Sequence, residues 1–180
     1  MRIISGIARG TKLYTLDGNN TRPTLDRIKE PLFSIIQNNI KDAIVLDLFS
    51  GSGALGLEAL SRGAKKAILC DKSYEAMDVI KRNIDKTHFE EKTEVFYGDY
   101  KKCLDKLNEK IDLIFIDPPY KLNIAVKAVD IILKKDLLAK DGIIVLETDD
   151  EQREIGQLES LNINIKDIRT YGRVKLIFLN

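Results

Sequence analysis

The chain has 180 residues, of which 44% are hydrophobic and 32% charged, and its formal net charge is +1. This length is enough for one domain with a sizeable core, and the composition is ordinary for a soluble globular protein. No apolar run approaches the roughly 20 residues that span a bilayer, and the N-terminus lacks a long apolar stretch before a small-residue cleavage site. We therefore expect a cytoplasmic protein without a membrane partner.

The rare residue types give little support to metal or disulfide chemistry. His88 is the only histidine in the sequence, so neither a Ser-His-Asp triad nor a histidine-rich metal site is predicted, and we expect no metal. Cys70 and Cys103 do not have the spacing of a metal or redox motif. Cys70 falls in an apolar run and Cys103 in a helix-like one, which favours buried thiols over a disulfide.

Residues 1–40 are predicted to form an extension to the main domain. Residues 2–16 read as two short strands broken by glycine, a hairpin-like arrangement. Thr24 can cap the helix that follows, and Pro31 either kinks this helix or starts a second one. Residues 1–30 carry a net charge of +3, which leaves −2 for the rest of the chain. Such a basic segment can contact phosphates, although solvated surfaces also carry charges at this density.

Residues 41–180 show short apolar strands that alternate with helices. This alternation predicts a doubly wound α/β domain, a mostly parallel seven-stranded sheet with right-handed crossovers. Two strands at the end of the chain, 163–170 and 174–179, read as a hairpin, so one strand should run antiparallel to the rest. The other strands are expected at 44–49, 67–71, 93–97, 111–117 and 143–148, and the helices at 54–62, 74–86, 101–108 and 124–134.

A glycine-rich loop follows the first strand of this series. Gly51, Gly53 and Gly56 have the spacing G-x-G-x-x-G, which permits a tight turn and a close approach of a ligand to the backbone. Asp71 ends the next strand, twenty residues after Gly51, where a carboxylate can accept both hydroxyls of a ribose. The glycine spacing alone is a weak signal. Strand, loop, helix, strand and acid in this order favour a nucleoside-binding site over a structural turn.

The position of Asp47, four residues before Gly51, indicates which nucleoside binds. A dinucleotide would place its pyrophosphate near the helix N-terminus, where this carboxylate would repel it. The amino group of a methionine moiety is positively charged and would be attracted instead. The pattern D-x-F-x-G-x-G resembles motif I of the class I S-adenosylmethionine methyltransferases.

The resemblance to motif I implies a set of S-adenosylmethionine contacts. Asp47 and the loop would hold the methionine part, Asp71 the ribose, and Asp99 the adenine amino group. A simple turn residue is the alternative for Asp99, which follows Gly98. The full set of predicted cofactor-binding residues is Asp47, Phe49, Ser50, Gly51, Ser52, Gly53, Asp71, Lys72, Asp99 and Tyr100.

The tetrapeptide Asp-Pro-Pro-Tyr at residues 117–120 follows the most apolar strand and so leaves the sheet at its carboxyl edge, beside the glycine loop. An exocyclic amine on a base is a poor nucleophile, because its lone pair is delocalised into the ring. The carboxylate of Asp117 and the carbonyl of Pro118 can each accept one N–H, which turns the lone pair towards the methyl group and stabilises the charge forming on nitrogen. Pro118 and Pro119 fix these acceptors, and Tyr120 offers a flat face to a base taken out of its stack. A proline-rich turn is the structural alternative.

This tetrapeptide matches the signature [DN]-P-P-[YF] of methyltransferases that act on base amines or on glutamine. The glutamine enzymes have Asn at the first position, so Asp117 favours a base. Taken whole, the chain resembles the RsmD family, the bacterial methyltransferases of guanine N2 in 16S ribosomal RNA. The resemblance runs nearly end to end. Its most discriminating segments are 2–13 and 170–179, and the other matching segments are 21–36, 46–64 and 117–120.

Membership of this family implies methyl transfer from S-adenosylmethionine to the N2 amine of a guanine in small-subunit ribosomal RNA. The substrate would be an assembled or partly assembled small subunit, with ribosomal proteins as partners, and the size of the chain suggests a monomer. The family often has Glu where Asp71 stands, a shortening that should still reach a ribose. The candidates for RNA contact are Arg2, Arg9, Lys12, Arg22 and Thr24, and for each a solvated surface position is the alternative.

Three other functions remain open from the sequence. An adenine-N6 methyltransferase of DNA or RNA also uses this tetrapeptide, but the DNA enzymes usually carry a target-recognition domain for which 180 residues leave no room. An NAD-dependent oxidoreductase would share the glycine spacing, and Asp47 argues against it. A non-catalytic RNA-binding module is disfavoured by the retention of Asp117 and Tyr120 together.

Overall fold

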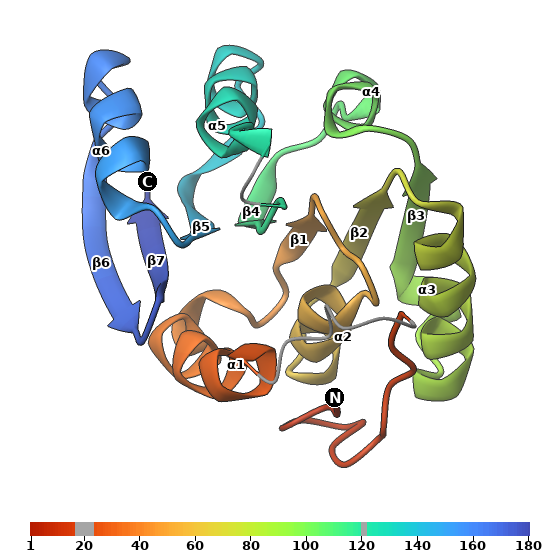
Figure 1. Cartoon of the computed structure of the whole chain (residues 1–180). Coiled ribbons are helices and arrows are strands. Elements are labelled where there is room, and N and C mark those ends of the chain that lie inside the picture. Colours follow the sequence, from red (N-terminus) through yellow and green to blue (C-terminus); the bar gives the residue numbers. More distant parts are fainter. Residues whose placement is uncertain (17–23, 120–121) are drawn as a thin grey trace.

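The computed structural model describes residues 1–16, 24–119 and 122–180, and residues 24–27 by their backbone alone (Figure 1). The helices are α1 (Thr24–Ile35), α2 (Ala54–Ser61), α3 (Tyr74–Thr87), α4 (Tyr100–Lys106), α5 (Ala125–Lys134) and α6 (Glu151–Ser160), with short 3₁₀ turns at Gln37–Asn39 and Glu90–Lys92. The strands are β1 (Ile44–Asp47), β2 (Lys66–Asp71), β3 (Thr93–Tyr97), β4 (Ile111–Ile116), β5 (Leu138–Thr148), β6 (Ile165–Tyr171) and β7 (Val174–Leu179).

The strands form a seven-stranded sheet in the order β3-β2-β1-β4-β5-β7-β6. Strands β1 to β5 pair in parallel, and β7 lies antiparallel between β5 and β6. The chain runs outward from β1 to β3 and then returns past β1 to β4, so the strand order reverses between β1 and β4. Ligands of doubly wound sheets bind at such a switch point, outside the carboxyl ends of the strands. The predicted fold class, including the terminal hairpin, is confirmed.

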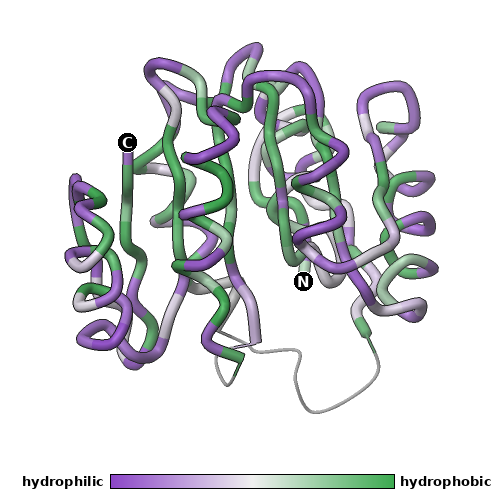
Figure 2. Tube along the Cα trace, turned by 90° about the horizontal axis from the view of Figure 1, so that it is seen from above, coloured by the Kyte–Doolittle hydropathy of each residue, from purple (hydrophilic) through white to green (hydrophobic). Residues whose placement is uncertain are grey.

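Helices cover both faces of the sheet (Figure 1). Helices α1, α2 and α3 lie on one face and contribute Leu32, Leu57 and Ile80 to one hydrophobic cluster. Helices α4, α5 and α6 lie on the other and contribute Leu104, Val129 and Leu158 to a second cluster. Figure 2 shows the strands as mainly hydrophobic between helices of mixed hydropathy, as a sheet covered on both faces requires.

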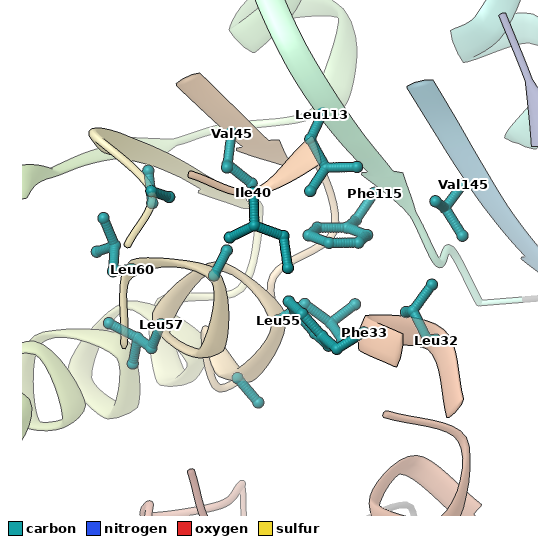
Figure 3. Close-up of a cluster of buried hydrophobic side chains, with 14 of the residues drawn as sticks. Leu32, Phe33, Ile40, Val45, Leu55, Leu57, Leu60, Leu113, Phe115 and Val145 are labelled. Atoms are coloured by element: carbon teal, nitrogen blue, oxygen red, sulfur yellow. The ribbon is translucent and has the colours of Figure 1, made fainter. Parts of the chain in front are cut away.

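Helix α1 is fastened to the sheet by aromatic packing. The ring of Phe33 lies 5.8 Å from the ring of Phe115 on β4, and both side chains are buried (Figure 3). Pro31 lies inside α1, which continues to Ile35, so no second helix starts there. The buried stripe of Ile28, Leu32 and Phe33 compensates for the hydrogen bond that a proline removes from a helix.

The structure differs from the sequence prediction at three elements. The two strands expected in residues 2–16 reduce to one isolated antiparallel bridge between Arg2 and Lys12. Strand β5 begins at Leu138, five residues earlier than expected, because it pairs with Ile111 ahead of a register shift. Helix α6 was not predicted, since its sequence is polar and contains a glycine. Its one clear sequence signal is Asp150, whose side chain accepts the backbone N–H of Arg153 as an N-cap.

Two further sequence expectations concern the cysteines and membrane-spanning helices. Cys70 and Cys103 are free and buried, as expected for structural thiols. The side chain of Cys103, together with burial, raises the pKa of Cys70, which keeps this thiol protonated. Within the described ranges, no helix is long and apolar enough to cross a membrane.

Candidate active site at the carboxyl edge of the sheet

The predicted acids gather at one edge of the sheet because three adjacent strands end there. Asp47 is the last residue of β1, Asp71 is the last residue of β2, and Asp117 directly follows β4. Strand β1 lies between β2 and β4, and Asp47 is in register with Phe115, two residues before Asp117. Because parallel strands end on the same side, the topology brings together three acids that are far apart in sequence (Figure 1).

The glycine loop turns sharply between β1 and α2. Gly51 and Gly53 have φ angles of +54° and +78°, which residues other than glycine rarely adopt. A Cβ atom on Gly51 would meet no other atom within 4 Å, so the space beside this residue is open. A Cβ on Gly56 would lie 2.3 Å from Leu69, so this glycine permits the close packing of α2 on β2. The first glycine therefore faces open space and the third serves helix packing.

Hydrogen bonds hold the loop in this shape. The hydroxyl of Ser50 donates to the carbonyl of Asp47 at 2.6 Å, and the N–H of Gly53 donates to the carbonyl of Ser50 at 2.7 Å. Asp71 accepts the N–H of Gly51 through Oδ2 at 2.8 Å and the N–H of Ser73 through Oδ1 at 2.9 Å. Asp71 thus ties the loop to the end of β2, and Lys72 beside it is exposed to solvent.

Asp47 is a buried carboxyl group with few interactions that would offset the cost of burying its charge. Its side chain is 3% exposed and accepts one N–H, from Gly56 at 3.2 Å. Burial raises the pKa of Asp47 to about 7, an effect that the Gly56 N–H opposes and the negative charge of Asp71 reinforces. A buried carboxylate beside an open turn is suited to a cationic ligand, because a positive charge would offset the free energy of burying the negative one.

Asp99 has a structural role that its position after Gly98 suggested. It is the N-cap of α4, where its Oδ1 accepts the N–H groups of Lys101 at 2.9 Å and Lys102 at 3.0 Å. The N–H of Lys102, with that of Lys101, lowers the pKa of Asp99. Tyr100, the next residue, is buried, and its ring lies 5.8 Å from that of Phe49 in the glycine loop. The predicted cofactor contacts at the start of α4 and in the glycine loop are therefore joined by an aromatic pair.

The tetrapeptide leaves the sheet in the position that the sequence predicted. The N–H of Leu48 donates to the carbonyl of Phe115 at 3.1 Å, so the pairing of β1 and β4 extends towards this edge. Asp117 is half-buried, Pro118 is buried and Pro119 is exposed. Tyr120 lies outside the described residues. The acceptor groups of Asp117 and Pro118 are thus placed at the edge next to the glycine loop.

Residues 1–16, here called the N-terminal arm, lie against α2 and α3 (Figure 1). Glu58 on α2 is fully buried and accepts the N–H groups of Ile4 at 2.8 Å and Ser5 at 3.0 Å. Ser61 receives the N–H of Ala8 at its hydroxyl and that of Ile7 at its backbone carbonyl. Ile3 and Leu13 belong to the same hydrophobic cluster as α2. The arm is therefore packed on the helix that follows the glycine loop.

The structure describes only some of the residues that the sequence predicts to contact RNA. Arg2, Arg9 and Lys12 are all exposed on the arm, and Ile7 at its tip is 80% exposed. Arg22 and the side chain of Thr24 lie outside what the structure describes. The exposed residues present three positive charges on one short segment, and positive side chains are the groups that neutralise phosphates.

Sequence reasoning missed two features near the site. Asn83 on α3 is fully buried and bonds both to the arm and to the glycine loop. Its signal was a polar residue on a helix face otherwise formed by Met77, Ile80 and Ile84. Tyr74, the first residue of α3, and Tyr97, the last residue of β3, form an edge-to-face pair with ring centres 6.2 Å apart, and both rings are largely exposed.

Comparisons with known proteins identify relatives of this chain and structures with a similar fold. The family model described as "Conserved hypothetical protein 95" matches residues 1–180. The chain is 37% identical over 154 residues to "Putative rRNA methyltransferase YlbH" of Bacillus subtilis, and the match covers 84% of each. It is 35% identical over 158 residues to "Ribosomal RNA small subunit methyltransferase D" of Haemophilus influenzae, covering 84% of this chain and 80% of the relative. Among solved structures, "Putative methyltransferase yhhF from Escherichia coli" aligns with a TM-score of 0.84 at 30% identity, covering 99% of this chain and 96% of that one.

Proposed function

Because this chain belongs to the Conserved hypothetical protein 95 family, the RsmD family to which its sequence pointed, we propose that it transfers a methyl group from S-adenosylmethionine to the N2 amine of a guanine in 16S ribosomal RNA. It is an S-adenosylmethionine-dependent rRNA methyltransferase, and its relatives in Haemophilus influenzae and Escherichia coli are named "Ribosomal RNA small subunit methyltransferase D". These names do not favour the adenine-N6 alternative. The observation that carries the proposal is the meeting of Asp47, Asp71 and Asp117 at the ends of the adjacent strands β1, β2 and β4.

The residues at this edge fit S-adenosylmethionine. The positive amino group of its methionine part suits Asp47, whose carboxylate is buried beside the open turn at Gly51. Asp71 keeps acceptor capacity for a ribose, because each of its oxygens takes a single N–H in the described structure. When bound, the cofactor supplies a methyl group on a sulfonium that is already primed for displacement. The proposed roles of Phe49, Ser50, Ser52, Gly53, Lys72, Asp99 and Tyr100 are to line the same site.

Asp117 and Pro118 are proposed to act on the base amine. The Asp117 carboxylate would accept one N–H of the amine and the Pro118 carbonyl the other, which directs the nitrogen lone pair away from the ring system. Pro118 is buried, its ring fixes its φ angle and the following Pro119 restricts its ψ angle, so the carbonyl is held in place. The role proposed for Tyr120 is to stack on the target base. Positioning therefore contributes most of the catalysis by this chain.

The N-terminal arm is proposed to contact the RNA while residues 41–180 bind the cofactor. The exposure of Arg2, Arg9 and Lys12 supports this division, and the same role is proposed for Arg22 and Thr24. The substrate is proposed to be an assembled or partly assembled small subunit, so that ribosomal proteins are neighbours of the bound enzyme. The enzyme is proposed to act in the cytoplasm as a monomer.

The proposal is tested by tritium transfer from labelled S-adenosylmethionine to small ribosomal subunits, free 16S rRNA and DNA in parallel, followed by nucleoside analysis. We expect label in N2-methylguanosine from the subunits. Label in N6-methyladenosine or in DNA would overturn the base or the substrate while keeping the methyl transfer. No label in any substrate, with cofactor bound, would overturn the proposed activity.

A further inference from the structure

Asn83 joins the N-terminal arm to the glycine loop through a side chain that is fully buried. Its Oδ1 accepts the N–H of Tyr14 at 2.7 Å. Its Nδ2 donates to the carbonyl of Tyr14 at 3.0 Å and to the carbonyl of Ser52 at 2.9 Å. The amide thus pairs with both backbone groups of one arm residue and with the middle residue of the glycine loop.

These three hydrogen bonds fix the amide in one orientation. Both of its N–H groups and its oxygen have partners, and a buried amide that lost one would carry a desolvation cost. Ser52 lies between Gly51 and Gly53, and because glycine has no Cβ this segment has unusual backbone freedom. A fixed donor at the Ser52 carbonyl therefore restricts the part of the loop that is proposed to face the cofactor.

The arm side of this connection is also held by α3. The guanidinium of Arg82 lies 3.9 Å from the centre of the Tyr14 ring, and the ammonium of Lys86 lies 4.3 Å from it. At the other end of the arm, Met1 Sδ accepts the Ser52 hydroxyl at 3.8 Å. Ser52 therefore contacts both ends of the arm, through Asn83 to Tyr14 and directly to Met1. The arm and the glycine loop are therefore connected at two points.

We propose that Asn83 is a positioning residue that couples RNA contact at the arm to cofactor affinity at the glycine loop. The inference rests on the proposed function, because it takes the RNA to bind the arm. RNA on Arg2, Arg9 and Lys12 restricts the arm, the arm restricts Asn83, and Asn83 holds the Ser52 carbonyl. Less loop ordering is then left for the cofactor to impose, so each substrate strengthens the binding of the other by the same factor.

The coupling is measured with labelled S-adenosylhomocysteine, which cannot donate a methyl group, by equilibrium dialysis with and without small ribosomal subunits. We expect small ribosomal subunits to raise the affinity of the native protein for S-adenosylhomocysteine about fivefold or more. This factor corresponds to the lower end of typical coupling energies. In Asn83→Ala the affinity should fall and the ratio should approach one. A native ratio of one, or an unchanged ratio in Asn83→Ala, would overturn the inference.

Thr87→Ala is the matched control on the same helix. The Thr87 side chain is buried one turn after Asn83, and its hydroxyl donates to the backbone carbonyls of Asn83 and Ile84 within α3. Loss of the Thr87 hydroxyl should lower the free energy of unfolding. The ratio of S-adenosylhomocysteine affinities with and without subunits should stay as in the native protein. If Thr87→Ala abolished the ratio as well, general loosening of α3 would explain the result and the specific role of Asn83 would be wrong.

Hydrogen exchange of the native protein provides a readout that no folding defect can affect. Binding of small subunits should slow amide exchange in the glycine loop in the absence of cofactor, and unchanged exchange there would overturn the coupling. Methyl transfer is assayed in the same samples. Transfer without any coupling would overturn this inference alone, whereas the absence of transfer to every substrate would overturn the proposed function.

Discussion

The ammonium of Lys29 on α1 lies 3.3 Å from the Glu58 carboxylate on α2, and neither side chain is exposed to solvent. Lys29 also donates to the backbone carbonyl of Arg2 at 2.5 Å, and Arg62 donates to Glu58 at 2.8 Å. Glu58 further accepts two N–H groups of the arm. One buried carboxylate on α2, the helix that follows the glycine loop, thus joins α1, α2 and the arm.

Replacement of this carboxylate should be strongly destabilising. Glu58→Ala removes the carboxylate that lies 3.3 Å from the buried Lys29 ammonium, so we expect the free energy of unfolding to fall by about 3 kcal/mol or more. Chemical denaturation measures this. In the double variant Glu58→Ala with Lys29→Met no buried charge is left behind, so it should be more stable than the single variant. Equal stability of the two would show that the ion pair is not the cause.

Asp117→Ala should remove methyl transfer and leave cofactor binding intact. The variant loses the acceptor proposed for the base amine, so we expect kcat to fall by about a hundredfold or more. Dialysis with labelled S-adenosylhomocysteine should give the native affinity. A variant that loses cofactor affinity but keeps its turnover at saturation would contradict the role assigned to Asp117.

Asp71→Ala should have the opposite pattern. It removes the proposed ribose acceptor and the acceptor of the Gly51 N–H, so cofactor affinity should fall by about tenfold or more. Asp71→Asn, which keeps one acceptor oxygen, should lose less. Cofactor affinity that is unchanged in Asp71→Ala would show that this carboxylate does not hold the ribose.

Cofactor affinity should depend on pH through Asp47. The carboxylate form is the one that attracts the cofactor amino group, and the pKa of Asp47 in the free protein is about 7. Below pH 7 the cofactor must displace a proton, so affinity should fall by about tenfold for each pH unit. Dialysis between pH 5 and 7.5 measures the slope. Asp47→Asn should bind weakly and lack this slope, and an equal slope in the variant would assign it to another group.

The same raised pKa has a consequence for stability. The folded protein holds this proton more tightly than the unfolded chain does. The stabilisation of the folded state by the protonated Asp47 is therefore fully present below about pH 4 and is lost as pH rises through 7. Asp47→Asn has no proton to lose. At pH 8 it should therefore raise the free energy of unfolding of the cofactor-free protein by roughly 1–4 kcal/mol. A variant less stable than the native protein at pH 8 would contradict this.

Two glycines of the arm form a matched pair. Gly6 and Gly10 have φ angles of +84° and +87°, but a Cβ on Gly6 would lie 1.7 Å from the Ser61 carbonyl, whereas one on Gly10 would meet nothing within 4 Å. Both alanine variants carry a similar backbone strain of about 1 kcal/mol. Gly6→Ala should in addition displace the arm tip and raise the KM for RNA several-fold above that of Gly10→Ala. Equal KM values would show that the docking of the tip does not affect the substrate.

Much of this protein is determined by local patterns in its sequence. The alternation of apolar strands and helices predicted the doubly wound sheet, because only a covered parallel sheet buries such strands. Gly51, Asp71 and Asp117 were predicted from the glycine spacing, the strand ends and the Asp-Pro-Pro-Tyr motif, since residues at the carboxyl ends of parallel strands meet at one edge. The family and its cofactor followed from motifs of this kind.

Only the tertiary structure decided how these parts hold one another. The sequence shows Asn83, Glu58 and Lys29 as ordinary polar residues of helices, yet all three are buried. Their partners in the N-terminal arm lie at sequence separations of 27 to 69 residues, which no local pattern reveals. The free energy of a buried polar group depends on the partners that folding brings to it. Whether these side chains are solvated or join the arm to the glycine loop is therefore a property of the packed chain.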